Sequence, residues 1–151
     1  MVRIERDPAF WANVASHLQV APHIGVGPEV VGEFALRPGV TPLAAEHGGF
    51  LFSTLDGMGM VRELHTLFTP EGWGREVARA AHEAFALIFA AGAQVIVTHE
   101  RADWWRSAPP KSHGWAVAGE WAGTAIGEVR MWVLTLDAWR ASPAVRRRAC
   151  H

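Results

Sequence analysis

The fold is decided by residues 59–99, which read GMVRELHTLFTPEGWGREVARAAHEAFALIFAAGAQVIVTH. The residue pattern predicts a strand at 59–68, a tight turn at 69–74, a helix at 75–91 and a second strand at 94–99. Two parallel strands need a crossover of this kind, and such crossovers are almost always right-handed. The stretch therefore predicts a strand–helix–strand unit built around a parallel pair.

Helical spacing is clearest in the middle of this unit. Apolar side chains recur there on one helix face, namely Val77, Ala81, Ala84, Phe85 and Ile88. Gly92 follows the last of them and is a natural C-terminal stop. Residues 95–97 are a continuous β-branched run, which favours a central strand covered on both faces. The turn at 69–74 delivers backbone N–H groups to a helix N-terminus, a ready site for a phosphate-like anion.

The composition is that of a globular protein. Of the 151 residues, 50% are hydrophobic and the net charge is −1, which argues against disorder and gives no reason to expect nucleic acid or an anionic membrane as a partner. No apolar run approaches the roughly 20 residues that span a bilayer, and the N-terminus does not resemble a signal peptide. The one cysteine, Cys150, allows no internal disulfide. We expect a cytoplasmic protein of one domain, with a helical segment at 1–39, a core at 40–135 and a tail at 136–151.

The remaining segments complete a mixed sheet. Outside 59–99 the sequence predicts helices at 7–18 and 29–36, strands at 40–45, 50–54, 115–119 and 128–134, and helical turns at 101–107 and 137–141. Asp7 is the expected N-cap of the first helix. Its buried stripe is expected to comprise Phe10, Val14, Leu18 and, as a further candidate, Trp11. The arginines at 146–148 are expected to form a solvated end. Together these elements predict an α/β fold, a mixed central sheet with helices on both faces.

The stretch 63–78, ELHTLFTPEGWGREVA, resembles the GNAT family of acyl-CoA-dependent N-acyltransferases. Members of that family commonly read apolar strand, Pro-Glu, and then Arg/Gln-x-x-Gly-x-Gly/Ala leading into a helix. Here the last motif falls on 73–78, and its final small residue is present as Ala78. Trp73 takes the position of the leading Arg or Gln, and Glu76 takes that of the middle Gly.

Two further segments are similar to GNAT proteins. Residues 111–119, KSHGWAVAG, look like the family's segment that ends in Gly-Phe before the sixth strand, with Trp115 in place of the Phe. Residues 1–40 look like those of GNAT-like proteins carried by phages and prophages. The order of predicted elements matches from about residue 40 to 134, so the resemblance implies the GNAT fold. GNAT relatives are often dimers, so a homodimer is one expectation.

The resemblance implies acetyl-CoA as co-substrate, wedged between two splayed parallel strands. The pantetheine would bond to backbone near 67–69, and the pyrophosphate would rest on amides around 74–78. The implied cofactor-binding residues are Leu67, Phe68, Thr69, Trp73, Gly74, Arg75, Glu76, Val77, Ala78 and Asp103. Glu76 would oppose binding of the pyrophosphate unless its side chain turns outward, and Arg75 or Arg79 could offset its charge.

Two departures from the family pattern concern the chemistry. The family often has an Asn at the start of the helix after its fifth strand, and Asp103 takes that position. It often uses a Tyr in the same helix to protonate the leaving thiolate, but that position is Pro110 and the chain contains no Tyr. An enzyme of this kind would take that proton from another group or from water.

Three side chains are candidates for activating an amine. Glu63 and His65 alternate on one face of the strand that borders the cofactor, and His99 ends the neighbouring parallel strand, where such sheets bind ligands. A histidine that is neutral near pH 7 suits a general base, acting directly or through water. The alternative is that His65 and His99 are ordinary half-buried histidines bonded to backbone.

Other classes of site match the sequence poorly. No His-x-x-x-His or His-Glu-x-x-His pattern supports a metal site, so we expect no metal. No Gly-x-Ser-x-Gly supports a serine hydrolase, and residues 72–74 lack the third Gly of a dinucleotide fingerprint. Trp104 and Trp105 could line an acceptor site, or one ring could pack in the core and the other lie on the surface.

Three functions stay open at this point. The first is an N-acetyltransferase that transfers acetyl from acetyl-CoA to a primary amine, on a small molecule or a protein, by direct attack. The second is a degenerate GNAT-fold protein that binds CoA or nothing and serves as an interaction or phage-accessory module, which Glu76, Pro110 and the missing Tyr favour. The third is a nucleobase-modifying enzyme, suggested by the phage-like N-terminus. The loops at 20–39 and 101–113 would select the acceptor.

Overall fold

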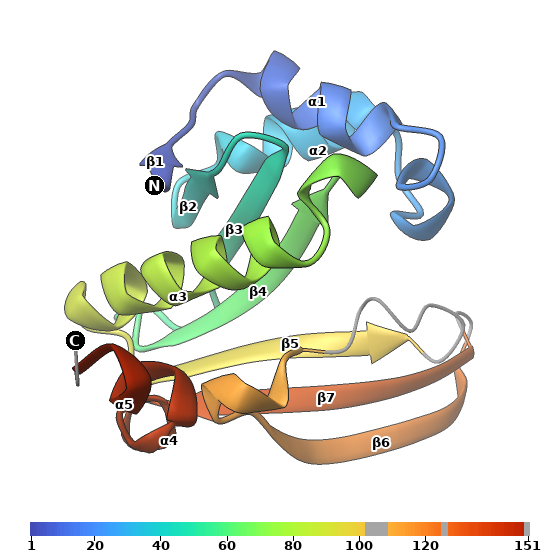
Figure 1. Ribbon diagram of the computed structural model, residues 1–151. Coiled ribbons are helices and arrows are strands. Elements are labelled where there is room, and N and C mark those ends of the chain that lie inside the picture. The colour runs from blue at the N-terminus through green and yellow to red at the C-terminus, as the bar shows by residue number, and fades with distance from the viewer. Residues whose placement is uncertain (102–108, 125–126, 150–151) are drawn as a thin grey trace.

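The computed structural model describes residues 1–101, 109–124 and 127–149 (Figure 1). Its strands are β1 (Arg3–Ile4), β2 (Val40–Ala44), β3 (Gly48–Thr54), β4 (Val61–Phe68), β5 (Val95–Arg101), β6 (Ala116–Thr124) and β7 (Gly127–Thr135). Its helices are α1 (Pro8–Ser16), α2 (Pro28–Ala35), α3 (Arg75–Ala90), α4 (Leu136–Ala141) and α5 (Pro143–Ala149).

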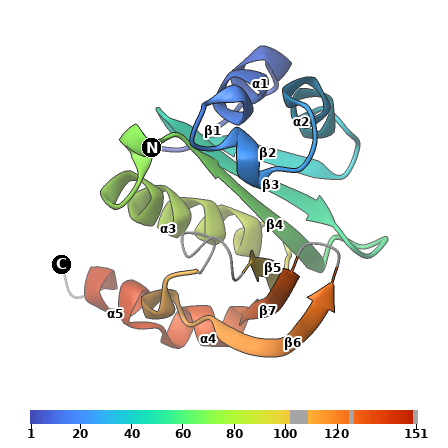
Figure 2. The same cartoon turned by 90° about the vertical axis from the view of Figure 1, so that its right-hand side faces the viewer.

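The strands form one mixed sheet in the order β1-β2-β3-β4-β5-β7-β6. β4 and β5 are parallel, and every other neighbouring pair is antiparallel. α3 is the crossover between the parallel strands, so the unit predicted from 59–99 is confirmed. α1 and α2 cover one face of the sheet, and α3, α4 and α5 cover the other (Figure 2). The expected fold class, a mixed sheet with helices on both faces, is therefore confirmed.

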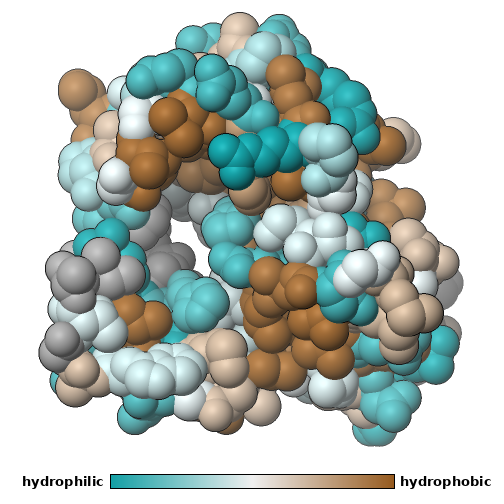
Figure 3. Space-filling view, turned by 180° about the vertical axis from the view of Figure 1, so that it is seen from behind, coloured by the Kyte–Doolittle hydropathy of each residue, from teal (hydrophilic) through white to brown (hydrophobic). Residues whose placement is uncertain are grey.

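The parallel pair separates along its length. Three residue pairs join β4 to β5, and the last of them joins Glu63 to Val97. β4 continues to Phe68 and β5 to Arg101, so both strands extend beyond their shared ladder. Figure 1 shows them diverging in that direction, and the view from behind shows a hollow between the two halves of the molecule (Figure 3). The sheet thus opens into a V-shaped gap between β4 and β5.

Helix α3 buries the stripe that its sequence predicts. Ala81, Ala84, Phe85 and Ile88 lie in one buried cluster with apolar side chains of β3, β4, β5 and β7, and Val77 is partly buried beside them. This cluster holds the helix across both arms of the V-shaped gap. The N-terminus of α3 is thereby fixed next to the end of β4.

The N-terminal helix differs from the prediction at one residue of its stripe. Asp7 caps α1 as expected, with its carboxylate accepting from a backbone N–H of the first turn at 2.9 Å. The helix ends at Ser16, so Leu18 lies beyond it and is 89% exposed. The side chains that α1 buries are Trp11, Val14 and Ala15, with Phe10 partly buried. Trp11, the further candidate of the prediction, is therefore part of the buried stripe, whereas Leu18 is not.

Within the expected C-terminal tail, residues 143–149 form a helix, α5, which the sequence did not predict. Pro143 takes the first helical position, and the Ser142 hydroxyl accepts from the N–H of Val145 at 3.4 Å, as an N-cap does. The arginines at 146–148 are exposed, as expected. β6 is also longer than the predicted strand at 115–119.

Several expectations concern residues that the structure does not describe. The helical turns expected at 101–107 fall there except for Arg101, which ends β5 as strand. Asp103, the tryptophans at 104–105 and Cys150 also lie outside the described residues. In the part that is described, none of the helices is long and apolar enough to cross a membrane.

Candidate active site

The two arms of the V-shaped gap meet at a buried hydrogen bond. The Thr98 hydroxyl on β5 donates to the Leu64 carbonyl on β4 at 3.0 Å, one residue past the last ladder pair. Thr98 is 8% exposed, so water does not compete for this bond. The bond fixes the apex at which the two strands part.

Replacing Thr98 by Val should destabilise the protein by about 1–3 kcal/mol, because the buried Leu64 carbonyl loses its donor while the side chain keeps its size. Urea unfolding followed by tryptophan fluorescence measures this change. Thr66→Val, which removes an exposed hydroxyl from the same arm, is the matched control and should change the free energy of unfolding by less than about 0.5 kcal/mol. Equal effects of the two variants would contradict a special role for the apex bond.

Glu63 and His65 come together just beside this apex. Their alternation along β4 puts both on the α1–α2 face, with His65 Nε2 3.2 Å from Glu63 Oε1. The edge of the Phe34 ring on α2 packs against the imidazole at a centroid distance of 5.4 Å. Burial lowers the pKa of His65, the Glu63 carboxylate opposes that shift, and His99 adds to it. The imidazole is therefore neutral near pH 7 and, when Nε2–H points to Glu63, presents Nδ1 as a proton acceptor.

His99 stands on the opposite arm at the same level. Because the ladder pairs Glu63 with Val97, two further residues along each strand bring His65 level with His99. The influence of His99 on the pKa of His65 reflects this proximity. His99 is exposed and lies outside the Glu63–His65 contact. The structure thus brings Glu63 and His65 into contact beside the apex and places His99 level with His65 on the opposite arm.

Backbone groups of β4 alternate between β3 and the V-shaped gap. The Thr69 amide donates to the β2–β3 turn at 2.9 Å, whereas the Phe68 carbonyl, on the other side, accepts from Trp73 Nε1 at 3.0 Å. By this alternation the backbone of Leu67 also faces β3, and the groups that face the gap belong to Thr66 and Phe68. Of the three residues expected to contact pantetheine through their backbone, Phe68 thus faces the gap, whereas Leu67 and Thr69 face β3.

The N-terminus of α3 presents backbone amides beside this edge. Gly74 precedes the helix with φ +92°, a conformation that favours glycine, and its position carries no side-chain cap. The first intrahelical bond runs from the Ala78 amide to the Gly74 carbonyl at 3.1 Å. The amides of Arg75, Glu76 and Val77 precede that bond and have no acceptor within the helix. Such a group of N–H donors suits a phosphate-like anion.

The Glu76 side chain turns away from these amides, which is the outward orientation that an anion site requires. Its two oxygens contact the His47 amide at 2.8 Å and His47 Nδ1 at 2.7 Å. The bond to Glu76 raises the pKa of His47. Burial alone would raise the pKa of Glu76, but the bonds from His47 outweigh it and hold that pKa below its ordinary value.

A basic hollow of about 340 Å³ lies one turn further along α3. It is lined by Ala78, Arg79, His82, Ser112, His113, Ala144, Arg147 and Arg148. Burial lowers the pKa of His82, and the Arg148 charge adds to that shift. No local pattern in the sequence indicates this hollow, because it forms only when α5 packs beside α3. Its guanidinium groups make it suited to a phosphate.

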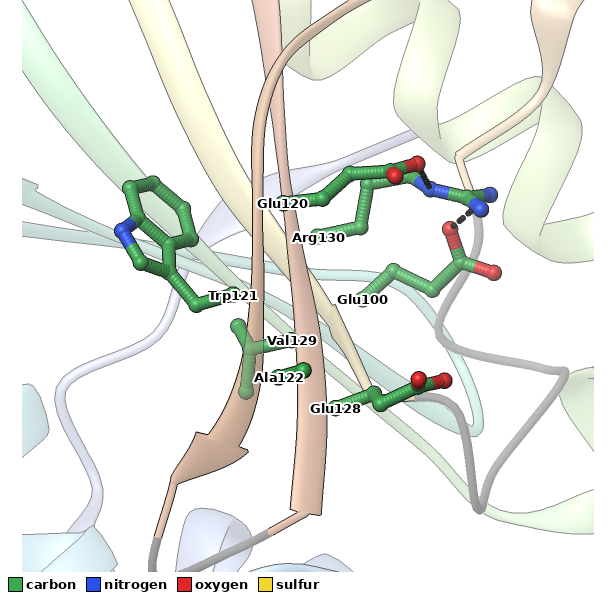
Figure 4. Close-up of a pocket in the computed structure, with 7 residues that line it drawn as sticks. All are labelled: Glu100, Glu120, Trp121, Ala122, Glu128, Val129 and Arg130. Atoms are coloured by element: carbon green, nitrogen blue, oxygen red, sulfur yellow. Dashed lines mark hydrogen bonds and ion pairs between the residues drawn. The ribbon is translucent and has the colours of Figure 1, made fainter.

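An acidic hollow of about 220 Å³ lies elsewhere, on β5, β6 and β7 (Figure 4). Arg130 contacts Glu120 at 2.7 Å and Glu100 at 3.3 Å, and Trp132 Nε1 donates to Glu100 at 2.8 Å. Trp121 points away from these side chains (Figure 4). Its carboxylates make this hollow unsuited to an anionic co-substrate.

The described residues offer few other elements of a catalytic site. Within 1–101, 109–124 and 127–149, no three His, Cys, Asp or Glu side chains gather as metal ligands would. Pro110, in the position where GNAT proteins often carry a Tyr, precedes the turn Lys111–His113. His113 is buried and stacks on Trp139 at a centroid distance of 5.9 Å. Among the described residues, the candidate bases near the apex are therefore His65, His99 and Glu63.

Solved structures that match this architecture include several acetyltransferases. Aminoglycoside 6'-acetyltransferase type Ii matches with a TM-score of 0.72 at 15% identity, over 89% of this chain and 96% of that one. The F149A mutant of spermidine N-acetyltransferase SpeG from Vibrio cholerae matches with a TM-score of 0.69 at 15% identity, over 93% and 98%. Aminoglycoside acetyltransferase AAC(6')-Ib in complex with coenzyme A matches with a TM-score of 0.68 at 15% identity, over 93% and 96%. No protein-family model and no curated protein sequence matches the chain.

The chain has the fold of the GNAT acetyltransferases. The likeness extends over the sheet and its helices, and at 15% identity it does not extend to individual residues. In this GNAT-fold chain the V-shaped gap, the α3 amides and the Glu63–His65 contact lie together at one end of the parallel pair. The phage-like character of 1–40, a single domain, a homodimer and a cytoplasmic location stay predictions.

Proposed function

We propose that this protein is an N-acetyltransferase that uses acetyl-CoA and transfers its acetyl group to a primary amine by direct attack. The observation that carries the proposal is the opening of the sheet between β4 and β5, with uncapped α3 amides at one side and the Glu63–His65 contact at the apex. A site for the anionic part of acetyl-CoA and a candidate base therefore lie next to each other. The similar structures include a GNAT-fold enzyme in complex with coenzyme A.

The arrangement admits two substrates from opposite faces of the sheet. The diphosphate of acetyl-CoA would rest on the amides of 75–77, and the pantetheine would bond to the backbone groups of Thr66 and Phe68 that face the gap. The thioester would then point toward the apex. Glu63 and His65 project from the α1–α2 face, so an amine arriving on that face would meet the thioester beside the base. Holding both reactants at one apex supplies most of the catalysis that such a reaction needs.

The chemistry requires one proton transfer during attack. The amine nitrogen forms a bond to the thioester carbonyl carbon, and the carbon–sulfur bond breaks to release CoA thiolate. His65 Nδ1 takes the proton that the nitrogen loses, while Glu63 orients the ring and stabilises its charged form. Because the chain has no Tyr, the thiolate takes its proton from solvent, and His65 returns to solvent the proton that it took from the amine.

Calorimetric titration with acetyl-CoA tests this function, with CoA and ATP as controls. We expect micromolar binding of acetyl-CoA and much weaker binding of ATP. Release of CoA thiol should then depend on an added amine. Aminoglycosides and spermidine are the first acceptors to assay, because two of the similar structures are an aminoglycoside 6'-acetyltransferase and a spermidine N-acetyltransferase. Absence of binding at millimolar acetyl-CoA would contradict the proposal.

A catalytically degenerate GNAT-fold protein is the second candidate. The observation that favours it is the absence of any Tyr together with Pro110 in the usual Tyr position. Such a protein would bind CoA or nothing and would act through a protein partner. Micromolar binding of acetyl-CoA without thiol release for any amine would support this candidate over the first.

The basic hollow should recognise the 3′-phosphate of CoA, because it lies one turn along α3 from the amides of 75–77 and is lined by arginines. Replacing Arg147 and Arg148 together by Ala should weaken acetyl-CoA binding by about 10-fold and leave the affinity for acetyl-3′-dephospho-CoA unchanged. Arg146→Ala is the matched control, since Arg146 is exposed but does not line the hollow. If the double variant binds both ligands as wild type does, the 3′-phosphate lies elsewhere.

A further inference from the structure

Glu76 occupies the middle-glycine position of the GNAT motif, yet its carboxylate is held by a residue of another element. Oε1 accepts from the His47 backbone N–H at 2.8 Å, and Oε2 lies 2.7 Å from His47 Nδ1. His47 belongs to the turn between β2 and β3. Both oxygens of Glu76 are thus engaged by one side chain and its backbone.

His47 also holds the turn that leads into α3. Its carbonyl accepts from the Thr69 amide at 2.9 Å and from the Thr69 hydroxyl at 3.4 Å. A Cβ added at Gly72 would lie 3.1 Å from the His47 Cβ, so the middle of the turn packs closely against it. One residue therefore contacts the start of the turn, its middle and the first turn of the helix.

A carboxylate in the first turn of a helix is attracted to the N-terminal N–H groups of its own helix. In that position the Glu76 carboxylate would occupy the amides of 75–77 and would repel a diphosphate. The contacts with His47 prevent this because they use both oxygens and draw the side chain toward the β2–β3 turn. The backbone N–H of residue 47 holds one oxygen whatever its side chain, and the imidazole holds the other. The imidazole therefore makes a glutamate at position 76 compatible with an open helix N-terminus.

We propose that His47 is a positioning residue for acetyl-CoA, whose side chain keeps the Glu76 carboxylate away from the α3 amides. The inference rests on the proposed function, because it concerns the site of the CoA diphosphate. It assigns the β2–β3 turn to the co-substrate site. It also explains how the chain combines Glu76 with an open helix N-terminus.

The experiment compares His47→Ala, Glu76→Gly and the double variant by calorimetric titration with acetyl-CoA. His47→Ala removes the Nδ1 contact but keeps the backbone N–H that holds Oε1. It should weaken binding by about 10-fold, because the less firmly held carboxylate can turn toward the amides and compete for them. Glu76→Gly should bind within about 3-fold of wild type. The double variant should bind like Glu76→Gly, because no carboxylate is left to compete.

Three controls separate this role from a general effect on the fold. Acetyl-pantetheine lacks the diphosphate, so its KM in the thiol-release assay should be the same for wild type and His47→Ala. His47→Asn keeps a donor near the place of Nδ1 and should retain wild-type affinity for acetyl-CoA. His17→Ala removes an imidazole that bonds to a backbone amide and not to Glu76, and it should have no effect.

Each outcome of the titrations has its own meaning. If wild type does not bind acetyl-CoA, the proposed function and this inference both fail. If wild type binds but the double variant is as weak as His47→Ala, His47 is a structural brace and only this inference fails. Wild-type affinity in His47→Ala would also overturn it. Should His47→Ala fail to fold, a loss of affinity in the folded His47→Asn variant would overturn the inference in its place.

Discussion

Replacing His65 by Gln is expected to lower kcat/KM for acetyl transfer by about 100- to 10,000-fold, the range typical of a lost general base. Gln keeps the size and polarity of the side chain but cannot take a proton at neutral pH. Affinity for acetyl-CoA should not change, because His65 lies on the face opposite to α3. Steady-state thiol release and calorimetric titration measure the two quantities separately.

His99→Gln is the matched control for that variant. His99 stands level with His65 but is exposed and lies outside the contact with Glu63, so its loss should cost less than about 10-fold. A larger loss of kcat/KM in His99→Gln than in His65→Gln would indicate that His99, and not His65, is the base. Equal, small losses would favour Glu63 or a water molecule as the base.

The pH dependence of kcat/KM follows from the pKa of His65. Burial lowers that pKa from its ordinary value of 6.5, so the neutral, active form persists below pH 6.5 and activity should fall only on the acid side of it. The Glu63 carboxylate raises the pKa of His65, so Glu63→Gln should move the acid limb to still lower pH. If Glu63 itself were the base, Glu63→Gln would abolish activity instead of shifting the limb.

Local patterns were sufficient to predict the parts of this fold that lie close together in the sequence. The helix 75–91 and the strands around it follow from spacing and β-branched runs, and the structure has them within a few residues. Asp7 as N-cap was readable from residue type alone. Leu18 was wrongly assigned to the buried stripe because α1 ends at Ser16, and the sequence pattern did not predict this end of the helix.

Only one part of the candidate site could be predicted from the sequence, namely the side chains that alternate along a single strand. Glu63 and His65 share a face for that reason, and their contact needs no long-range information. The level of His99, and the side toward which the backbone of Leu67 faces, depend on strand register, which a single sequence does not encode locally. The partners of Glu76 and of the C-terminal arginines come from distant elements, so no pattern near them could reveal the contacts.

Replacing Gly74 by Glu is expected to weaken acetyl-CoA binding by at least about 100-fold, because it places a carboxylate beside the amides that would hold the diphosphate. Gly74 is exposed, and a Cβ there meets no atom within 4 Å, so the loss would not come from a steric clash inside the protein. Its φ of +92° adds backbone strain of about 1–3 kcal/mol for any other residue. Calorimetric titration measures the affinity, and thermal unfolding measures the strain.

Two further variants separate the effect of the added charge from the effect of the backbone strain. Gly74→Ala carries the strain without the charge, and should weaken binding by about 10-fold or less. Gly92→Glu carries both at the other end of α3, since Gly92 has φ +107° and also meets no atom within 4 Å. It should lower the unfolding temperature but leave the affinity for acetyl-CoA unchanged. A loss of affinity in Gly92→Glu as large as in Gly74→Glu would mean that destabilisation of the helix, and not the anion site at its N-terminus, accounts for the result.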